Sequence, residues 1–190
     1  IPDTAGETIL LSNAAGTVSA NEFITLIGKK PPDVTEFDAQ TLFPTAGTLK
    51  KFYVELMTAP GAGNSRTFTI RLNGTGQSLA VTISGTATTG NDTANTVTIA
   101  AGDKVTIQET ETGTPASSRA KFGITFLPDT QGEWFTSATT DDLTSSTVVE
   151  FQQLTAGDTT LTATESEQHG LASATTAKKI YVNLSTAPGT

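Results

Sequence analysis

Apolar residues recur at every second position through much of the first 126 residues, which is the pattern of a β-strand with one buried face. The alternating sets are Phe52/Val54/Leu56, Phe68/Ile70/Leu72, Leu79/Val81/Ile83, Val97/Ile99, Val105/Ile107 and Phe122/Ile124/Phe126. Shorter apolar runs at Ile9-Leu10-Leu11 and at residues 23–27 predict further strands. The pattern therefore predicts about eight strands and an all-β antiparallel sandwich or barrel.

Turn residues separate these strands at regular intervals. Asn73-Gly74-Thr75-Gly76 predicts a tight hairpin over residues 66–84, because Asn and Gly tolerate positive φ. Ala101-Gly102-Asp103 predicts a second hairpin. Residues 85–95 and 109–118 lack the alternation and are predicted to be loops.

Helical signals are weak. The early strands end at Lys29-Lys30-Pro31-Pro32, because Pro has no backbone N–H to donate to a neighbouring strand. Residues 32–43 contain three acids and are predicted to hold one short turn of helix. Residues 158–170 offer a second helical alternative, which their high Thr content disfavours.

The chain also repeats itself. Residues 127–133 match residues 1–7 at five of seven positions, and residues 177–189 match residues 49–61 at nine of thirteen. A unit of about 126 to 128 residues is a whole domain rather than a solenoid repeat. We therefore expect one complete β-sandwich repeat over residues 1–128 and the first half of a second over residues 129–190.

The two ends of the chain fall differently in this unit. The sequence starts at a unit boundary and stops just before the position of the best hairpin. A half unit has open strand edges and is marginal alone. We expect the strands of residues 129–190 to pair with the first unit or with another chain, or to belong to a domain whose remainder is missing.

Composition narrows the class of protein. A net charge of −8 argues against nucleic acids and anionic membranes as partners, and no apolar run is long enough to insert into a membrane. Thr accounts for 39 of the 190 residues, whereas charged residues make up 16%. Thr suits half-exposed strands, so this composition favours extracellular or virion β-structure.

A resemblance follows from three of these motifs. The segment Thr96-Val97-Thr98-Ile99-Ala100-Ala101-Gly102-Asp103-Lys104-Val105-Thr106-Ile107 is similar to the strand–Gly-Asp–strand turn of C1q- and TNF-like jelly rolls. Together with Lys50-Lys51-Phe52-Tyr53-Val54, Thr58-Ala59-Pro60-Gly61 and the Asn73-Gly74 hairpin, it resembles repeat domains of tailed-phage virion proteins across residues 47–126. The resemblance implies a jelly-roll β-sandwich, often trimeric, in capsid decoration, head fibres or tail fibres. It carries over no catalytic residue.

Catalytic signals are missing from the sequence. His169 is the sole His, it has no counterpart in the first repeat, and no G-x-S-x-G motif accompanies it. With no Cys and one His, the chain cannot build a zinc site alone. We therefore predict no catalytic residue, no cofactor and no enzymatic activity.

Acidic residues are the candidates for calcium ligands and for a catalytic pair. Acid-rich loops occur at Asp141-Asp142, at Gly90-Asn91-Asp92 and at residues 33–38, but none has the spacing of a calcium loop. The candidate acids for glycoside hydrolysis are Glu55, Glu109, Glu111, Glu133 and Glu150. No spacing selects two of them as a catalytic pair. We therefore predict that these acidic side chains are solvated and that the acid-rich loops hold no metal ion.

Other candidate contacts lie on strand faces. Lys50-Lys51 and Lys178-Lys179 open the repeated strand, where they would blunt a sheet edge or pair with an acidic neighbour. Tyr53, Tyr181 and Trp134 are candidate exposed aromatics for sheet packing, subunit contact or sugar binding.

These observations predict a non-enzymatic structural protein of the virion surface. We expect a homo-oligomer, with a trimer favoured, that contacts other virion proteins and displays weak binding sites many times over. One alternative is a secreted adhesin or carbohydrate-binding module that binds a cell-surface glycan. Another is a β-sandwich glycan hydrolase or lyase, which requires convergent carboxylates in a groove.

Overall fold

A computed structural model describes residues 6–130 together with Val182 and Leu184. The predictions for the second repeat, including Asp141-Asp142, residues 158–170, His169, Trp134, Tyr181 and Lys178-Lys179, lie outside the described residues.

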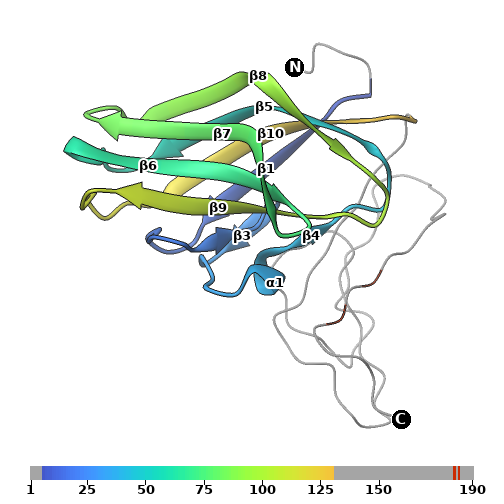
Figure 1. Ribbon diagram of the computed structural model, residues 1–190, viewed down its shortest axis with the longest axis horizontal. Helices are drawn as coiled ribbons and strands as arrows, with labels where there is room; N and C mark the ends of the chain where they lie inside the picture. Colours follow the sequence, from blue (N-terminus) through green and yellow to red (C-terminus); the bar gives the residue numbers. More distant parts are fainter. Residues whose placement is uncertain (1–5, 131–181, 183, 185–190) are drawn as a thin grey trace, which may run out of the picture.

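The described chain forms two β-sheets that pack face to face, with one short helix at their side (Figure 1). The first sheet has the order β3 (Gly28–Lys30), β1 (Thr8–Ala14), β10 (Ala120–Pro128), β5 (Gly47–Leu56) and β8 (Thr89–Ile99). The second has the order β2 (Phe23–Ile24), β9 (Lys104–Thr112), β6 (Gly61–Leu72) and β7 (Thr75–Gly85), and β4 (Thr41–Leu42) also pairs with β9. The helix is α1 (Glu36–Ala39).

The chain crosses repeatedly between the two sheets. It changes sheet from β5 to β6, from β7 to β8, from β8 to β9 and from β9 to β10, while β6 and β7 form a hairpin within the second sheet. Strands β1 and β10, which are far apart in sequence, pair in antiparallel register. Two sheets packed face to face, built mostly from antiparallel pairs, confirm the predicted all-β sandwich.

The alternating residues of the sequence form the core between the sheets. Phe122 lies at the centre of an aromatic cluster, edge-on to Phe68 at 5.3 Å between ring centroids and stacked with Phe52 at 6.3 Å. Phe43 packs edge-on against Phe126 at 5.1 Å. Burying one such side chain contributes roughly 2 to 3 kcal/mol, and each aromatic pair adds about 1 kcal/mol.

One of the two predicted hairpins is confirmed. Leu72 pairs with Thr75, so Asn73 and Gly74 form a two-residue hairpin loop, with φ of 49° and 82°. Positive φ at both positions is the geometry of a type I′ turn. The other predicted hairpin is wrong, because the strands on either side of Ala101-Gly102-Asp103 are β8 and β9, which belong to different sheets and do not pair with each other. The helix α1 lies within residues 32–43, where one short helical turn is expected.

Both predicted loops are partly wrong. Strand β8 starts at Thr89, inside residues 85–95, and β9 continues to Thr112, inside residues 109–118. The start of β8 lacks apolar residues because it lies at a sheet edge and pairs only with β5 in the described chain. Its inward position is Gly90, where a Cβ would lie 2.7 Å from Val81 Cγ1. The described residues contain ten strands rather than about eight, because the alternation pattern predicts neither of the short strands β3 and β4.

Candidate functional site

Three apolar side chains are exposed on the outer face of the first sheet, and we call them the outer apolar patch: Ile9, Leu11 and Tyr53. Leu11 pairs with Gly123 of β10, and Gly123 pairs with Tyr53 of β5, so Leu11, Gly123 and Tyr53 form one row across the sheet. Ile9 pairs with Thr125 and lies in the next outward-facing row. Leu11 and Tyr53 are 65% and 51% exposed. Between them, a Cβ on Gly123 would have only Leu11 Cδ2 nearby, at 3.6 Å. Gly123 therefore adds no side chain between Leu11 and Tyr53.

The patch departs from the ordinary strand pattern. On β1, Ile9 and Leu11 face outward at 49% and 65% exposure, whereas Leu10 between them is 3% exposed and packs in the core. An antiparallel sheet that meets water usually carries polar residues on its outer face. Apolar residues on both faces of β1 therefore indicate a surface suited to a contact.

Charged side chains border this patch. Lys121 Nζ lies 3.3 Å from Glu55 Oε2 in the neighbouring row, with both side chains more than half exposed. Such a surface ion pair contributes at most about 1 kcal/mol. Glu55 thus lies on the solvent face, as its position in the alternation predicts.

The prediction that Lys50 and Lys51 blunt a sheet edge is wrong. Strand β5 lies between β10 and β8, inside the first sheet. The alternation predicts only the end of β8, at Val97 and Ile99, and a loop over residues 85–95, where β8 already pairs with β5. Lys50 Nζ forms an ion pair with Glu7 Oε1 at 2.5 Å, and the Glu7 side chain is 1% exposed. The acidic partner of Lys50 therefore belongs to the same chain. Lys51 has φ of 55° and lies at a β-bulge between the paired positions 50 and 52.

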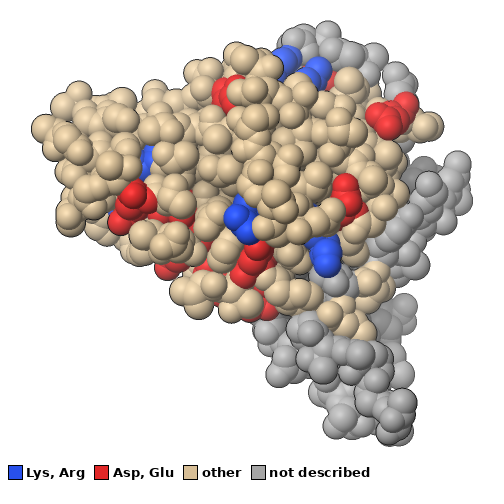
Figure 2. Space-filling view, in the orientation of Figure 1, with Lys and Arg blue, Asp and Glu red and all other residues tan. Residues whose placement is uncertain are grey.

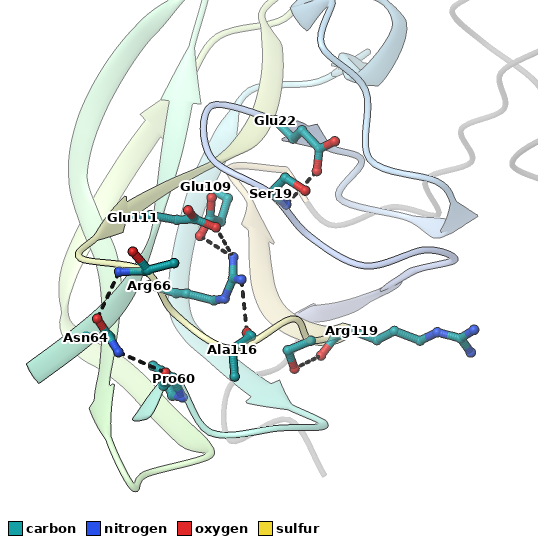
Figure 3. Close-up of polar contacts among 11 residues, drawn as sticks. Ser19, Glu22, Pro60, Asn64, Arg66, Glu109, Glu111, Ala116 and Arg119 are labelled. Carbon is teal, nitrogen blue, oxygen red and sulfur yellow. Dashed lines mark hydrogen bonds and ion pairs between the residues drawn. The ribbon is translucent and has the colours of Figure 1, made fainter. Parts of the chain in front are cut away.

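A buried ionic network lies at one end of the core (Figure 3). Arg66 of β6 donates from Nη1 to Glu109 Oε1 at 2.9 Å and to Glu111 Oε1 at 2.6 Å, and from Nη2 to the Ala116 carbonyl at 3.1 Å. The Arg66 and Glu109 side chains are 3% and 0% exposed. Burial raises the pKa of Glu109 to about 7, although the Arg66 guanidinium opposes this shift.

The network fastens the connection between β9 and β10. Besides the bond from Arg66 to Ala116, Asn64 Oδ1 accepts a hydrogen bond from the Thr114 backbone N–H at 2.9 Å (Figure 3). Glu109 and Glu111 do converge, but on one arginine and with Glu109 inside the core, where a substrate cannot reach it. Their role in the fold is to hold a loop, and the pair offers no groove for glycoside chemistry.

The alternation of inward and outward side chains along each strand could have located this network. Arg66 is in phase with Phe68 on β6, and Glu109 is in phase with Ile107 on β9. Both therefore point inward with the core residues. The alternation stops before Glu109, so residues 109–118 are predicted to be a loop and the network does not emerge from the sequence.

The described candidates for calcium ligands serve local structure instead. Asp92 is 9% exposed and accepts hydrogen bonds from the backbone N–H groups of Ala80, Ala94 and Asn95 at 3.2, 3.1 and 3.0 Å. Burial alone would raise the pKa of Asp92, but these hydrogen bonds and one from the Asn95 side chain lower it below its usual value. Asp92 thus ties the edge strands β7 and β8 together across the sandwich.

The acids of residues 33–38 are engaged in a similar way. Asp33 accepts from the Thr35 backbone N–H, and Glu36 pairs with Arg71 at 2.9 Å. Within residues 6–130, Val182 and Leu184, no group of three or more His, Cys, Asp or Glu side chains is placed to hold a metal ion.

Charge is dispersed on the face shown in Figure 2, where acidic and basic side chains occur singly or in small groups among uncharged residues. Among the described residues, no helix has the length and apolar character needed to cross a membrane. No protein-family model matches the chain, and no curated protein matches it.

Proposed function

We propose that this chain is a non-enzymatic structural protein of the virion surface, of the capsid-decoration or fibre type, that acts through homo-oligomeric assembly. The outer apolar patch is the observation that supports this function. A sheet face with Leu11 65% and Tyr53 51% exposed is suited to a contact with another subunit.

The size of the patch favours a closed oligomer over an isolated pair. Burying three half-exposed apolar side chains contributes roughly 3 to 5 kcal/mol, which is no more than the cost of about 4 to 15 kcal/mol for bringing two proteins together. In a closed ring each subunit uses two surfaces, so weak contacts reinforce one another. A trimer on the virion, in contact with other virion proteins, would then present each surface feature several times and gain avidity.

The test is the mass of the protein in solution, measured by size-exclusion chromatography with light scattering. We expect the full chain to be a trimer and Leu11→Glu to shift it toward monomer, because a buried unpaired carboxylate opposes association. Ser78→Glu is the matched control, because Ser78 is exposed on β7 of the other sheet. A monomeric wild-type chain, or equal effects of both substitutions, would contradict the proposal.

A second candidate is an adhesin or carbohydrate-binding module. Tyr53 favours it, because an exposed ring on a sheet face can stack on a sugar and no other aromatic side chain among the described residues is exposed. Binding on a glycan array that is lost in Tyr53→Ala, with an unchanged oligomer, would support the glycan as partner over the subunit contact.

A further inference from the structure

The dipeptide Asn73-Gly74 occurs once in the 190 residues and forms the tip of the β6–β7 hairpin. Asn followed by Gly is the pair most prone to spontaneous deamidation, because Gly has no side chain to hinder its backbone nitrogen. That nitrogen can attack the Asn side-chain carbonyl carbon. Both residues are exposed, so water has access to this tip.

Hydrogen bonds hold the Asn73 side chain at both of its polar atoms. Nδ2 donates to Asp103 Oδ1 at 2.8 Å, and Oδ1 accepts from the Lys104 backbone N–H at 3.0 Å. The Asn73 backbone N–H also donates to the Lys104 carbonyl at 2.8 Å. A carboxylate and a backbone N–H as partners fix which side-chain atom is nitrogen and which is oxygen. We call these three bonds the tip clamp.

The glycine is anchored from its other side. Arg71 donates from Nη2 to the Gly74 carbonyl, and its Nε lies 2.9 Å from Glu36 Oε1. Arg71 Nη1 donates to Gln108 Oε1 at 2.9 Å. Gly74 therefore cannot move independently of the second sheet, and Asn73 cannot rotate toward it without breaking the tip clamp.

We propose that Asn73-Gly74 is a deamidation site that the tip clamp keeps unreactive in the folded protein. When the tip opens, a bond forms between Gly74 N and Asn73 Cγ, and the Cγ–Nδ2 bond breaks. Ammonia leaves, taking up the proton released from the Gly74 nitrogen. Water then opens the resulting succinimide at either carbonyl and yields aspartate or isoaspartate at position 73, with no change of oxidation state.

The product cannot restore the clamp. A carboxylate at position 73 has no N–H to donate to Asp103 and places two negative charges where a 2.8 Å hydrogen bond was. Isoaspartate also inserts an extra backbone atom into a two-residue turn, whose geometry tolerates no insertion. One opening event thus becomes a permanent separation of the β6–β7 tip from the β8–β9 turn.

The experiment follows deamidation of the full chain by peptide mapping and mass spectrometry, with isoaspartate quantified, in native buffer and in denaturant at the same mildly alkaline pH. Since the clamp holds several hydrogen bonds, we expect the native rate to be lower by on the order of tenfold or more. Equal rates in native buffer and in denaturant would overturn the proposal without any variant.

Two substitutions locate the protection in the clamp. Asp103→Ala removes the acceptor for Nδ2 and should raise the native rate toward the unfolded rate, with folding checked by circular dichroism. Asp103→Asn loses the bond that Oδ2 accepts from the Ala100 backbone N–H at 2.7 Å but can still accept from Asn73 Nδ2 through its amide oxygen, so its rate should stay closer to that of the wild type. If folded Asp103→Ala deamidates no faster than the wild type, the clamp is not the protecting element.

Discussion

Replacing Glu109 with Gln should remove a pH dependence from the stability of the protein. Folding raises the pKa of Glu109 from 4.5 to about 7, because burial removes the carboxylate from water and outweighs the opposing effect of the Arg66 guanidinium. Glu109 Oε2 lacks a hydrogen-bond partner among the described residues. A raised pKa means that the folded state holds the proton more tightly. Its contribution to stability is therefore complete below pH 4.5 and is lost as pH rises through about 7.

The size of the effect follows from the shift. Each pKa unit corresponds to about 1.4 kcal/mol, so Glu109 alone should lower the free energy of unfolding by about 3 kcal/mol between acid and neutral pH. Asp92 does not interfere with this measurement. Its pKa is lowered from 3.8, so its contribution to stability is complete above pH 3.8 and is lost only at more acid pH. Glu109→Gln keeps the shape and an oxygen acceptor for Arg66 but has no proton to release.

The assay is urea denaturation of both proteins at about pH 5 and about pH 8. Protonated Glu109 stabilises the wild type at the lower pH and has nearly ceased to do so at the higher pH, whereas Glu109→Gln has no such contribution at either pH. We expect the wild type to lose about 2.5 kcal/mol more than Glu109→Gln between these two pH values, because part of the Glu109 contribution is already lost at pH 5. Glu55→Gln is the control, because the Glu55 side chain is 58% exposed. This variant should lose as much stability between the two pH values as the wild type. Parallel pH profiles for wild type and Glu109→Gln would refute the reasoning.

Two further predictions concern the edge strands. Asp92→Ala leaves three backbone N–H groups without their acceptor and should cost about 2 to 4 kcal/mol in urea denaturation, whereas Asp92→Asn, which keeps one acceptor oxygen, should cost less. Gly90→Ala places a Cβ 2.7 Å from Val81 Cγ1 and should lower the free energy of unfolding by about 1 to 3 kcal/mol. Gly16→Ala, with its nearest neighbour at 3.7 Å, should change stability by less than about 0.5 kcal/mol; equal costs at the two glycines would contradict this account.

Much of the sandwich could be predicted from residue alternation, because a buried face requires an apolar residue at every second position. Phe122 and Phe68 were identified as core residues in this way, and both are buried. The start of β8 could not be identified, because Gly90 and Asp92 supply its inward and buried positions without an apolar side chain. Backbone pairing to β5 is what makes that segment a strand.

The outer apolar patch was only half predictable. Tyr53 alternates with Phe52 and Val54, so its outward position follows from the sequence. Ile9, Leu10 and Leu11 are consecutive apolar residues, and periodicity cannot tell which of them faces the core. The answer depends on the register of β1 against β10, which pairs Leu11 with Gly123 and is invisible in local sequence.

The pairing of β1 with β10 also has a consequence for the order of folding. The β6–β7 hairpin closes within a short stretch of chain. Strand β1 pairs with the nearby β3 on one side, but its partner on the other side lies more than a hundred residues downstream, as in the pairing of Leu10 with Ile124. Contacts of such long sequence separation form slowly. During synthesis β1 therefore leaves the ribosome long before β10, and the edge that β10 will cover stays open meanwhile, with apolar residues on both faces of the strand. Such an open edge with exposed apolar residues is prone to aggregation until β10 pairs with it.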